Sequence, residues 1–495
     1  MAIRKICGVE TEYGIFGTGA ESNPVAASSL LVNAYASEVD RRTGWDFEDE
    51  TPGNDARGFA REGAMPPMVE THLANTVLTN GARYYVDHAH PEYSTPECSD
   101  PLEAVLHDKA GEEVLRRSMR AALNYPGNPT VVVYKNNSDG KGNSYGCHEN
   151  YLMDRNVAFA KVVTGIVPHF VTRAIYTGAG KVGTETASFG GERLDFQLTQ
   201  RAEFFEELVG LETTLKRPIV NTRDEPHADP KRFRRLHVIV GDANLSEVAT
   251  FLKVGTTALV LAMIEDDALP ARELSLDDPV RAMHQVSADR SLTRPLPVVD
   301  GTTITALELQ WELFTAARRY AKEHGLEALG AESVGEMVLD RWEGVLHGLE
   351  TDPTSLVHQL DWVAKLHLLE GYRERHGCAW DDSRLAAVDL QYHDLRPERS
   401  LFARLSMERL VDDADVALAV TEPPLGTRAW FRGKCLARWP EAVVTANWDS
   451  LVFDLGSDPL RRVPMMDPLK GTAEHTASLL DACAGPADLL DRLSS

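Results

Sequence analysis

The sequence lacks the patterns of disulfide-bonded, zinc-binding and membrane-spanning proteins. Its six cysteines are scattered without CxxC spacing, which favours reduced thiols and excludes a zinc framework; they are Cys7, Cys98, Cys147, Cys378, Cys435 and Cys483. The longest apolar runs, such as residues 257–264, are too short to cross a bilayer, and no charged-then-apolar signal segment opens the chain. We therefore expect a cytoplasmic protein with no membrane partner.

Basic charge is also scarce. The 75 acidic residues outnumber the 51 lysines and arginines, which gives a net charge of −24. A nucleic-acid-binding protein carries a basic surface instead, so we expect no nucleic-acid partner. One basic stretch, residues 231–237 (KRFRRLH), leaves room for a local groove that receives an acidic substrate.

Two common phosphate-binding loops are missing as well. Residues 178–183 fit the GxGxxG pattern, but this pattern has physical meaning only between a strand and a helix. Here it follows an expected helix over residues 157–176 and leads into a loop rich in Gly, Thr and Ser, so we reject a dinucleotide-binding fold. The chain has no GxxxxGK[ST] motif and no internal repeat.

A central stretch, residues 80–92 (NGARYYVDHAHPE), combines a turn signal with a polar strand. Its first two residues favour a turn, and the aromatic and β-branched residues that follow favour a strand. Because alternate side chains of a strand share a face, Arg83, Tyr85 and Asp87 point the same way. A cation, a phenol and a carboxylate suit a site for phosphate, metal and a reacting carbonyl. A solvated face with an Arg–Asp ion pair is the alternative.

A second polar strand is expected over residues 3–15, where Glu10 and Glu12 share a face. Two like charges on one strand face are destabilising unless a cation or an arginine neutralises them. Carboxylates of this kind bind Mg²⁺, usually together with substrate phosphates. An exposed edge strand is the alternative.

Histidines occur on two further polar segments. The Gly/Asn/Ser-rich residues 135–152 carry His148, and an expected strand over residues 234–242 carries His237. A lone strand histidine is more often a hydrogen-bonded core residue than a ligand, so the ligand interpretation depends on convergence with other polar residues. The full candidate set is Glu10, Glu12, Arg83, Tyr85, Asp87, Glu92, His148, Arg223 and His237. Such a set on antiparallel strands suits Mg²⁺–nucleotide binding, with Asp87 left free as nucleophile or base.

The remaining patterns outline the domain organisation. Apolar periodicity predicts helices over residues 24–39, 102–123, 243–265, 304–324, 331–350 and 355–369, and strands over residues 130–134 and 443–453. The polar, Gly/Pro-rich residues 41–75 are interpreted as a flexible loop insert, either a mobile functional loop or a disordered segment. A change of character near residue 421 divides the chain into a large domain, 1–420, and a small C-terminal domain, 421–495.

The same residues lie in long motifs that resemble the Pup ligase/depupylase family, in which Pup is the prokaryotic ubiquitin-like modifier. The motifs are GVETEYG (8–14), NGARYYVDHAHPEYSTPEC (80–98), KNNSDGKGNSYGCHENY (135–151), NTRDEPHAD (221–229) and RRLHVIVGDAN (234–244). The resemblance implies an α+β, glutamine-synthetase-like fold: a curved, mainly antiparallel sheet packed by helices, with a small C-terminal domain.

The resemblance also implies roles for individual residues. Glu10, Tyr85 and Glu92 match the family's Mg²⁺ ligands, and Arg83, Thr95 and Trp448 match its ATP-contacting residues. Asp87 matches the catalytic aspartate. Glu12 and His237 would be further metal or phosphate partners by analogy with the glutamine synthetase fold. Arg223 and His227 would line the groove that receives Pup.

Two features resemble the depupylase branch rather than the ligase branch: the long insert at residues 41–75 and the Asp-His-Ala-His run that begins at Asp87. The depupylase branch hydrolyses the isopeptide bond between the C-terminal glutamate of Pup and a substrate lysine, and deamidates the C-terminal glutamine of Pup. It needs ATP or ADP with Mg²⁺ as a bound cofactor. The expected partners are Pup and pupylated proteins, and the expected state is a monomer. A Pup–protein ligase acting through a γ-glutamyl phosphate and a catalytically inactive Pup-binding adaptor are the alternatives.

Overall fold

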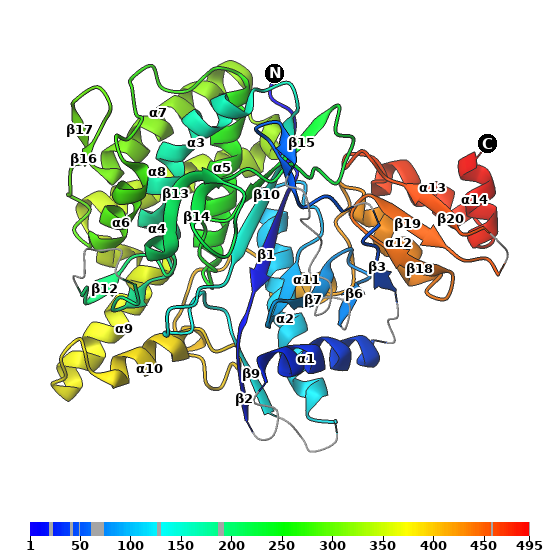
Figure 1. Ribbon diagram of the computed structural model, residues 1–495, viewed down its shortest axis with the longest axis horizontal. Helices are drawn as coiled ribbons and strands as arrows, with labels where there is room; N and C mark the ends of the chain where they lie inside the picture. Colours follow the sequence, from blue (N-terminus) through cyan, green and yellow to red (C-terminus); the bar gives the residue numbers. More distant parts are fainter. Residues whose placement is uncertain are drawn as a thin grey trace.

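A six-stranded antiparallel sheet lies at the centre of the protein (Figure 1). The computed structural model describes residues 1–18, 23–39, 43–48, 50–60, 74–125, 130–186, 193–456 and 459–494. The strand order is β15 (Phe233–Val238), β10 (Cys147–Asp154), β1 (Cys7–Glu12), β8 (His90–Ser94), β7 (Arg83–Asp87) and β6 (Asn75–Val77). Segments that are distant in the sequence therefore lie side by side.

The two faces of this sheet differ in polarity because side chains alternate along each strand. Val9, Tyr84 and Leu236 belong to the buried face. Helices α2 (Pro101–Ala122) and α5 (Glu247–Glu265) pack on the sheet, and α3 (Phe159–Thr172) packs on α5. The opposite face carries the polar residues of β1, β7, β8, β10 and β15.

Helix α5 is the centre of the helical layer behind the sheet (Figure 1). The side chain of Ser246 caps it by accepting a hydrogen bond from the backbone N–H of Ala249. By length and composition α5 alone, among the described helices, could cross a membrane, but its whole apolar window is buried inside the protein. This is the environment of a core helix.

Shorter elements complete the large part of the chain. Its other helices are α1 (Pro24–Glu38), α4 (Ala174–Thr177), α6 (Pro279–Ala288), α7 (Ala306–His324), α8 (Glu332–Thr351), α9 (Asp361–His376), α10 (Ser383–Tyr392) and α11 (Asp413–Ala419). Its small strand pairs are β2 (Gly14–Thr18) with β9 (Thr130–Tyr134), β4 (Asn54–Asp55) with β5 (Phe59–Ala60), β11 (Lys181–Val182) with β12 (Phe196–Gln197), β13 (Phe205–Gly210) with β14 (Arg217–Asn221), and β16 (Leu296–Pro297) with β17 (Thr303–Ile304).

Most expected helices are confirmed, but several boundaries are wrong. The expected strand over residues 3–15 is two strands, because β2 leaves the central sheet and pairs with β9. The expected helix over residues 157–176 is divided into α3 and α4, and the strand expected to reach residue 242 ends at Val238. The helix expected over residues 355–369 begins only at Asp361, since Asp352 caps a separate 3₁₀ turn over Pro353–Leu356. Residues 178–183 follow α4 and open no helix, which agrees with the rejection of a dinucleotide-binding loop.

The C-terminal region has its own sheet and apolar core. Helices α12 (Ala429–Arg438), α13 (Ala473–Ala482) and α14 (Pro486–Ser494) accompany a sheet of order β20 (Arg461–Pro464), β19 (Ser450–Phe453), β18 (Val443–Ala446) and β3 (Gly44–Trp45). The strand expected over residues 443–453 is therefore a hairpin, because the Asn447 side chain accepts hydrogen bonds from the backbone of Asp449 and Ser450 and reverses the chain. Trp448 lies in this turn.

Strand β3 comes from the segment expected to be a structureless insert. It pairs in parallel with β18, and the Trp45 ring joins the apolar core of the C-terminal region. Backbone pairing and an apolar anchor therefore dock strand β3 and Trp45, and the role of residues 41–75 as a flexible loop insert stays a prediction. Residues 61–73 of the predicted loop lie outside the described residues. The division of the chain at residue 421 stays a prediction.

A buried ion pair lies directly behind the polar face. The Arg173 guanidinium donates to both carboxylate oxygens of Glu149, at 2.7 and 2.8 Å, and Tyr151 donates to the same carboxylate at 2.6 Å. Burial opposes ionisation of Glu149, but Arg173 outweighs it and lowers the pKa of that carboxyl. The pair thus keeps an acid charged inside the core.

Removing one partner of this pair should destabilise the fold strongly. We expect Arg173→Leu to lower the free energy of unfolding by about 3–5 kcal/mol, because it leaves the Glu149 charge buried and unpaired. The exposed pair between Arg272 and Glu312 is the control, and Arg272→Leu should change stability by less than about 1 kcal/mol. Urea denaturation measures both variants, and equal effects would contradict the burial argument.

Candidate functional site

The antiparallel register gathers the polar residues of five strands on one face. Glu12 lies opposite Glu92, and Glu92 lies opposite Tyr85. One row further along, Ser94 lies between Glu10 and Arg83. Directly opposed residues of antiparallel strands share a face at close distance. The sequence therefore places these side chains on one surface, but only the strand pairing makes them neighbours.

Three carboxyl groups converge around the row of this face that holds Glu12 and Glu92. One oxygen each of Glu12, Asp87 and Glu92 lies within 4.8 Å of the others. Burial, then repulsion by Asp87, Glu12 and Glu10, raises the pKa of Glu92 well above its usual value. Oxygen donors in a cluster that resists full ionisation fit a hard divalent cation such as Mg²⁺.

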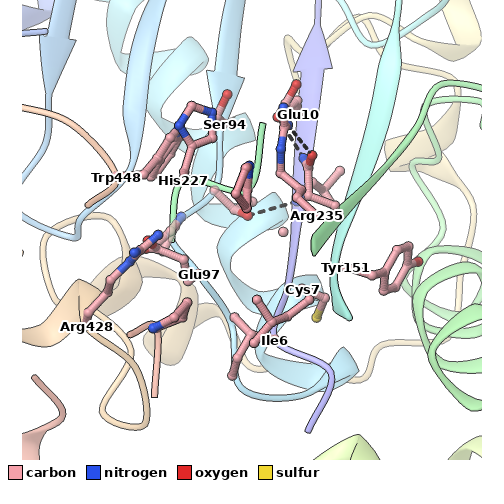
Figure 2. Close-up of a pocket in the computed structure, with 18 residues that line it drawn as sticks. Ile6, Cys7, Glu10, Ser94, Glu97, Tyr151, His227, Arg235, Arg428 and Trp448 are labelled. Atoms are coloured by element: carbon pink, nitrogen blue, oxygen red, sulfur yellow. Dashed lines mark hydrogen bonds and ion pairs between the residues drawn. The ribbon is translucent and has the colours of Figure 1, made fainter. Parts of the chain in front are cut away.

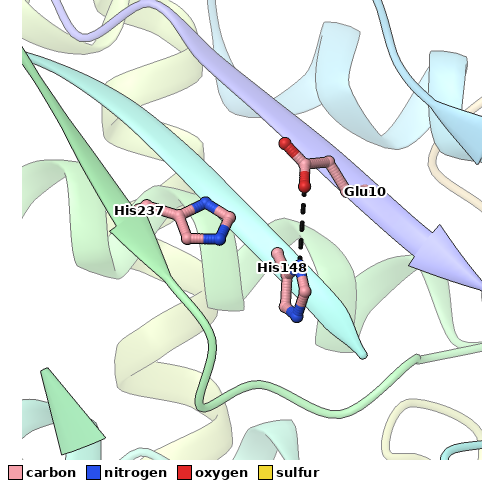
Figure 3. A group of neighbouring side chains, drawn as sticks. All are labelled: Glu10, His148 and His237. Atoms are coloured by element: carbon pink, nitrogen blue, oxygen red, sulfur yellow. Dashed lines mark ion pairs between the residues drawn. The ribbon is translucent and has the colours of Figure 1, made fainter. Parts of the chain in front are cut away.

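A second group consists of Glu10, His148 and His237, whose ligand atoms also lie within 4.8 Å of one another (Figure 3). Burial, reinforced by the charge of Arg235, holds the pKa of His237 well below its usual value, so this imidazole is neutral. Its Nδ1 lies 3.0 Å from the Asn150 side-chain oxygen and 3.3 Å from Nη1 of Arg235. A neutral imidazole of this kind fits a metal ligand.

Asn150 connects this group to the rest of the site. Its side-chain nitrogen donates to Glu10 at 2.7 Å, and its oxygen accepts from Arg235 at 2.7 Å. Burial opposes ionisation of Glu10, but His148, His237 and Arg235 outweigh it and lower the pKa of that carboxyl. Glu10 is thus ionised, whereas the pKa of Glu92 is raised.

Asp87 ends strand β7 beside two histidines. Its Oδ2 lies 2.6 Å from Nδ1 of His88, whose backbone φ of +52° is unusual for a residue with a side chain. Burial opposes ionisation of Asp87, but hydrogen bonding to His88 and the charges around it outweigh burial, so its pKa is lowered. His90 lies opposite Asp87 and stacks on the Tyr145 ring at 4.3 Å. Asp87 is therefore ionised and partly exposed, as a nucleophile or base requires.

Arg83 is held by aromatic rings instead of a carboxylate. Its guanidinium lies 3.8 Å from the centre of the Tyr85 ring and 4.0 Å from that of Trp45. Within the described residues its side chain forms no ion pair of 4 Å or less. Burial and the nearby Glu92 raise the pKa of Tyr85 well above its usual value, so Tyr85 is a neutral phenol. The role of Tyr85 as a metal ligand stays a prediction.

A cavity opens beside residues 6–10 of strand β1, with Glu10 at one end (Figure 2). Thr95 and Trp448, both expected to contact ATP, line it together with Glu10, Glu97 and Arg428. The Thr95 hydroxyl accepts a hydrogen bond from the backbone N–H of Val9 at 3.0 Å, which fixes that side chain. Trp448 meets Trp45 edge to face at 5.2 Å, so Arg83 connects to this wall through the Trp45 ring.

A larger space of about 1440 Å³ adjoins this cavity. His227 lines both, and its expected role in the groove that receives Pup stays a prediction. The exposed Phe59 ring and the exposed Met466 side chain give the larger space an apolar wall. Arg223, the other expected groove residue, lines neither space.

Sequence reasoning missed several residues of this surface. His90 shares the face of Glu92 by simple alternation, so that signal was present. Gly146, Glu97 and Arg428 carry no local signal, because their importance depends on contacts with remote segments. A Cβ atom on Gly146 would lie 2.3 Å from the His148 ring and 2.7 Å from the Glu12 carboxylate.

The fold places two groups of possible metal ligands on the polar face of an antiparallel sheet. The sequence matches the family described as Pup-ligase protein over residues 5–452, and the chain belongs to this family. It is 52% identical over 506 residues to the depupylase of Acidothermus cellulolyticus, covering 99% of both chains. It is 46% identical over 510 residues to the Pup deamidase/depupylase of Mycobacterium tuberculosis, covering 100% of this chain and 99% of the relative.

Solved structures agree with this assignment. The Pup ligase PafA in complex with Pup matches with a TM-score of 0.80 and 30% identity, covering 99% of this chain and 94% of that one. PafA in complex with ADP matches with a TM-score of 0.74 and 35% identity, covering 82% and 89%. The expected α+β, glutamine-synthetase-like fold is confirmed.

A side chain at position 146 should disrupt both ligand groups at once. We expect Gly146→Ala to weaken Mg²⁺ binding about 10–100-fold, because its Cβ displaces the His148 ring and the Glu12 carboxylate. Gly344 on α8 has no neighbour within 4 Å of an added Cβ, so Gly344→Ala is the matched control. Isothermal titration with Mg²⁺ measures the difference; unchanged binding by Gly146→Ala would place the ion elsewhere.

Cation binding should also release a proton. The raised pKa of Glu92 means that, without a cation, this carboxyl keeps its proton to a higher pH than an ordinary glutamate does, and a metal ligand must be deprotonated. We expect up to about one proton to be released per Mg²⁺, with the amount increasing as the pH falls below the raised pKa. Titration in buffers of different ionisation enthalpy counts the protons. Glu92→Gln should abolish the release, and release that persists in this variant would contradict the assignment.

Proposed function

We propose that this chain is a depupylase and Pup deamidase. It hydrolyses the isopeptide bond between the C-terminal glutamate of Pup and a substrate lysine, and it converts the C-terminal glutamine of Pup to glutamate. The observation that carries this proposal is the carboxyl group pair in which Asp87 is ionised while Glu92 resists ionisation. Opposite pKa shifts in neighbouring acids assign them different roles.

The choice of branch depends on similarity. Identity to the depupylase and Pup deamidase/depupylase relatives is 52% and 46%, whereas identity to three Pup–protein ligases is 37%, 42% and 39%. A Pup–protein ligase is the alternative function. Incubation with Pup, ATP and a target protein decides between them: conjugates disappear with a depupylase and accumulate with a ligase.

The proposed cofactors are ATP or ADP and Mg²⁺, and the relative that binds ADP supports a nucleotide. Glu12 and Glu92, with Glu10, His148 and His237, would hold the ions. When bound, Mg²⁺ neutralises carboxylates and polarises the oxygens it touches. Thr95 and Trp448 would line the nucleotide cavity, and Arg83 would balance phosphate charge. We further propose a cytoplasmic monomer whose partners are Pup and pupylated proteins.

Asp87 carries the chemical step in this proposal. Its carboxylate either attacks the side-chain carbonyl of the Pup residue or removes a proton from an attacking water. In the first route a C–O bond forms, the C–N bond breaks, and the amine leaves as it gains a proton. Water then opens the anhydride and regenerates Asp87. His88 keeps Asp87 ionised in both routes.

Replacing this carboxylate should stop turnover and spare binding. We expect Asp87→Asn to reduce cleavage of a Pup conjugate about 10²–10⁴-fold, because the amide is neither nucleophile nor base. Nucleotide and Pup affinities should change little. A hydroxylamine trap under single-turnover conditions separates the two routes, since only the anhydride yields an Asp87 hydroxamate.

Asp340→Asn, an exposed change on α8, is the control and should retain wild-type cleavage. Near wild-type cleavage by Asp87→Asn would disprove the catalytic assignment. Loss of Mg²⁺ binding in Asp87→Asn would instead identify Asp87 as a metal ligand, which its distance from Glu12 and Glu92 permits.

A further inference from the structure

Glu97 connects the large part of the chain to the C-terminal region at the wall of the nucleotide cavity. It follows strand β8 and lies two residues after Thr95. Its carboxylate accepts from Arg428 Nε at 2.7 Å and pairs with both terminal nitrogens of Arg432. Both arginine side chains are almost fully buried, at 3% and 0% exposure. Figure 2 shows Glu97 and Arg428 pointing toward one another beside Trp448.

Arg432 transmits this contact to Trp448. Its Nη1 donates to the Trp448 backbone carbonyl at 3.0 Å, and its guanidinium carbon lies 5.2 Å from the centre of the Trp448 ring. Its Nη2 donates to the carbonyl of Gly81 at 2.9 Å, in the turn that opens strand β7. The Arg432 guanidinium therefore contacts the turn before strand β7, the Glu97 carboxylate and the turn that carries Trp448.

The approach of helix α12 to this turn is close. A Cβ atom on Gly81, whose φ is +83°, would lie 3.1 Å from the Cβ atom of Ala429. The Thr427 hydroxyl also donates to the backbone carbonyl of Glu97 at 2.7 Å. Burial opposes ionisation of Glu97, but Arg432 and Arg428 outweigh it and lower its pKa to about 2. The ion pair thus stays charged across the neutral pH range.

We propose that Glu97 is a positioning residue that fixes the Trp448 wall of the nucleotide cavity through Arg432. The proposal rests on the nucleotide binding included in the proposed function. Glu97 and backbone carbonyls accept the hydrogen bonds of Arg428 and Arg432. These two arginines therefore support the cavity instead of binding phosphate. Nucleotide affinity consequently depends on a carboxylate that need not touch the nucleotide.

Glu97→Gln tests this positioning role because it keeps the shape of the side chain and removes its charge. We expect it to weaken ADP binding about tenfold in isothermal titration, while binding of inorganic tripolyphosphate, which has no base to meet Trp448, stays unchanged. In the conjugate-cleavage assay the apparent KM for nucleotide should rise and kcat at saturation should remain. A residue with only a structural role would lower active protein without separating KM from kcat.

A double-mutant cycle identifies the route of the effect. In a Trp448→Ala background, Glu97→Gln should cause no further loss of ADP affinity, because its target is already absent. Glu97→Asp keeps the charge and shortens the side chain, so it should give a smaller loss of ADP affinity. It replaces Glu97→Gln in the test if that variant does not fold. The exposed pair of Arg232 with Asp467 also connects the two regions, and Arg232→Gln is the control that should bind ADP normally.

The outcomes are distinct. Wild-type affinity in Glu97→Gln, or independent losses in the double variant, would overturn the positioning role. Tighter ADP binding in Glu97→Gln would overturn it too, by showing that the freed arginines bind phosphate. If the wild-type chain bound no ADP at all, the proposed cofactor would fail, whatever the variants do.

Discussion

Electrostatic repulsion among carboxylates is the constraint on which the active face depends. The antiparallel register brings Glu12 and Glu92 directly opposite each other and Asp87 close by. Such a cluster is unfavourable unless it takes up protons or a cation. The two acids show opposite shifts: the pKa of Glu92 is raised and the pKa of Asp87 is lowered. Repulsion thus raises the pKa of Glu92, while the hydrogen bond from His88 keeps Asp87 ionised beside it.

Positive charge on this face is distributed so that it does not cancel the cluster. Arg83 is stacked between the rings of Tyr85 and Trp45, while Arg235 contacts Asn150 and lies 3.9 Å from Glu10. An arginine held by rings, as Arg83 is, remains available to an anion, whereas arginines paired with carboxylates, such as Arg235 with Glu10 and Glu225, are less available. Arg432 belongs to the second kind, because it is paired with Glu97. Arg432 lies behind the cavity wall and supports Trp448, which lines it.

The C-terminal region and the segment around Trp45 depend on each other. Strand β3 extends the C-terminal sheet, and the Trp45 ring lies between Arg83 and Trp448. A segment whose composition resembles a free loop thus packs between Arg83 of the sheet and Trp448, which lines the cavity. Its aromatic residues indicate that the segment docks, but not where, because the Trp448 ring and the edge of strand β18 that receive it lie about four hundred positions away.

The sequence by itself determined which side chains share a face of each strand. Alternation placed Arg83, Tyr85 and Asp87 together, and Glu10 with Glu12, because the period of a strand is two residues. It also predicted most helices, whose apolar periodicity is local. Only the tertiary structure decided that the acids form two ligand groups instead of one, that Gly146 must lack a side chain, and that Glu97 holds Arg432 below Trp448. These contacts join segments far apart in the chain, and no local pattern records the register that brings them together.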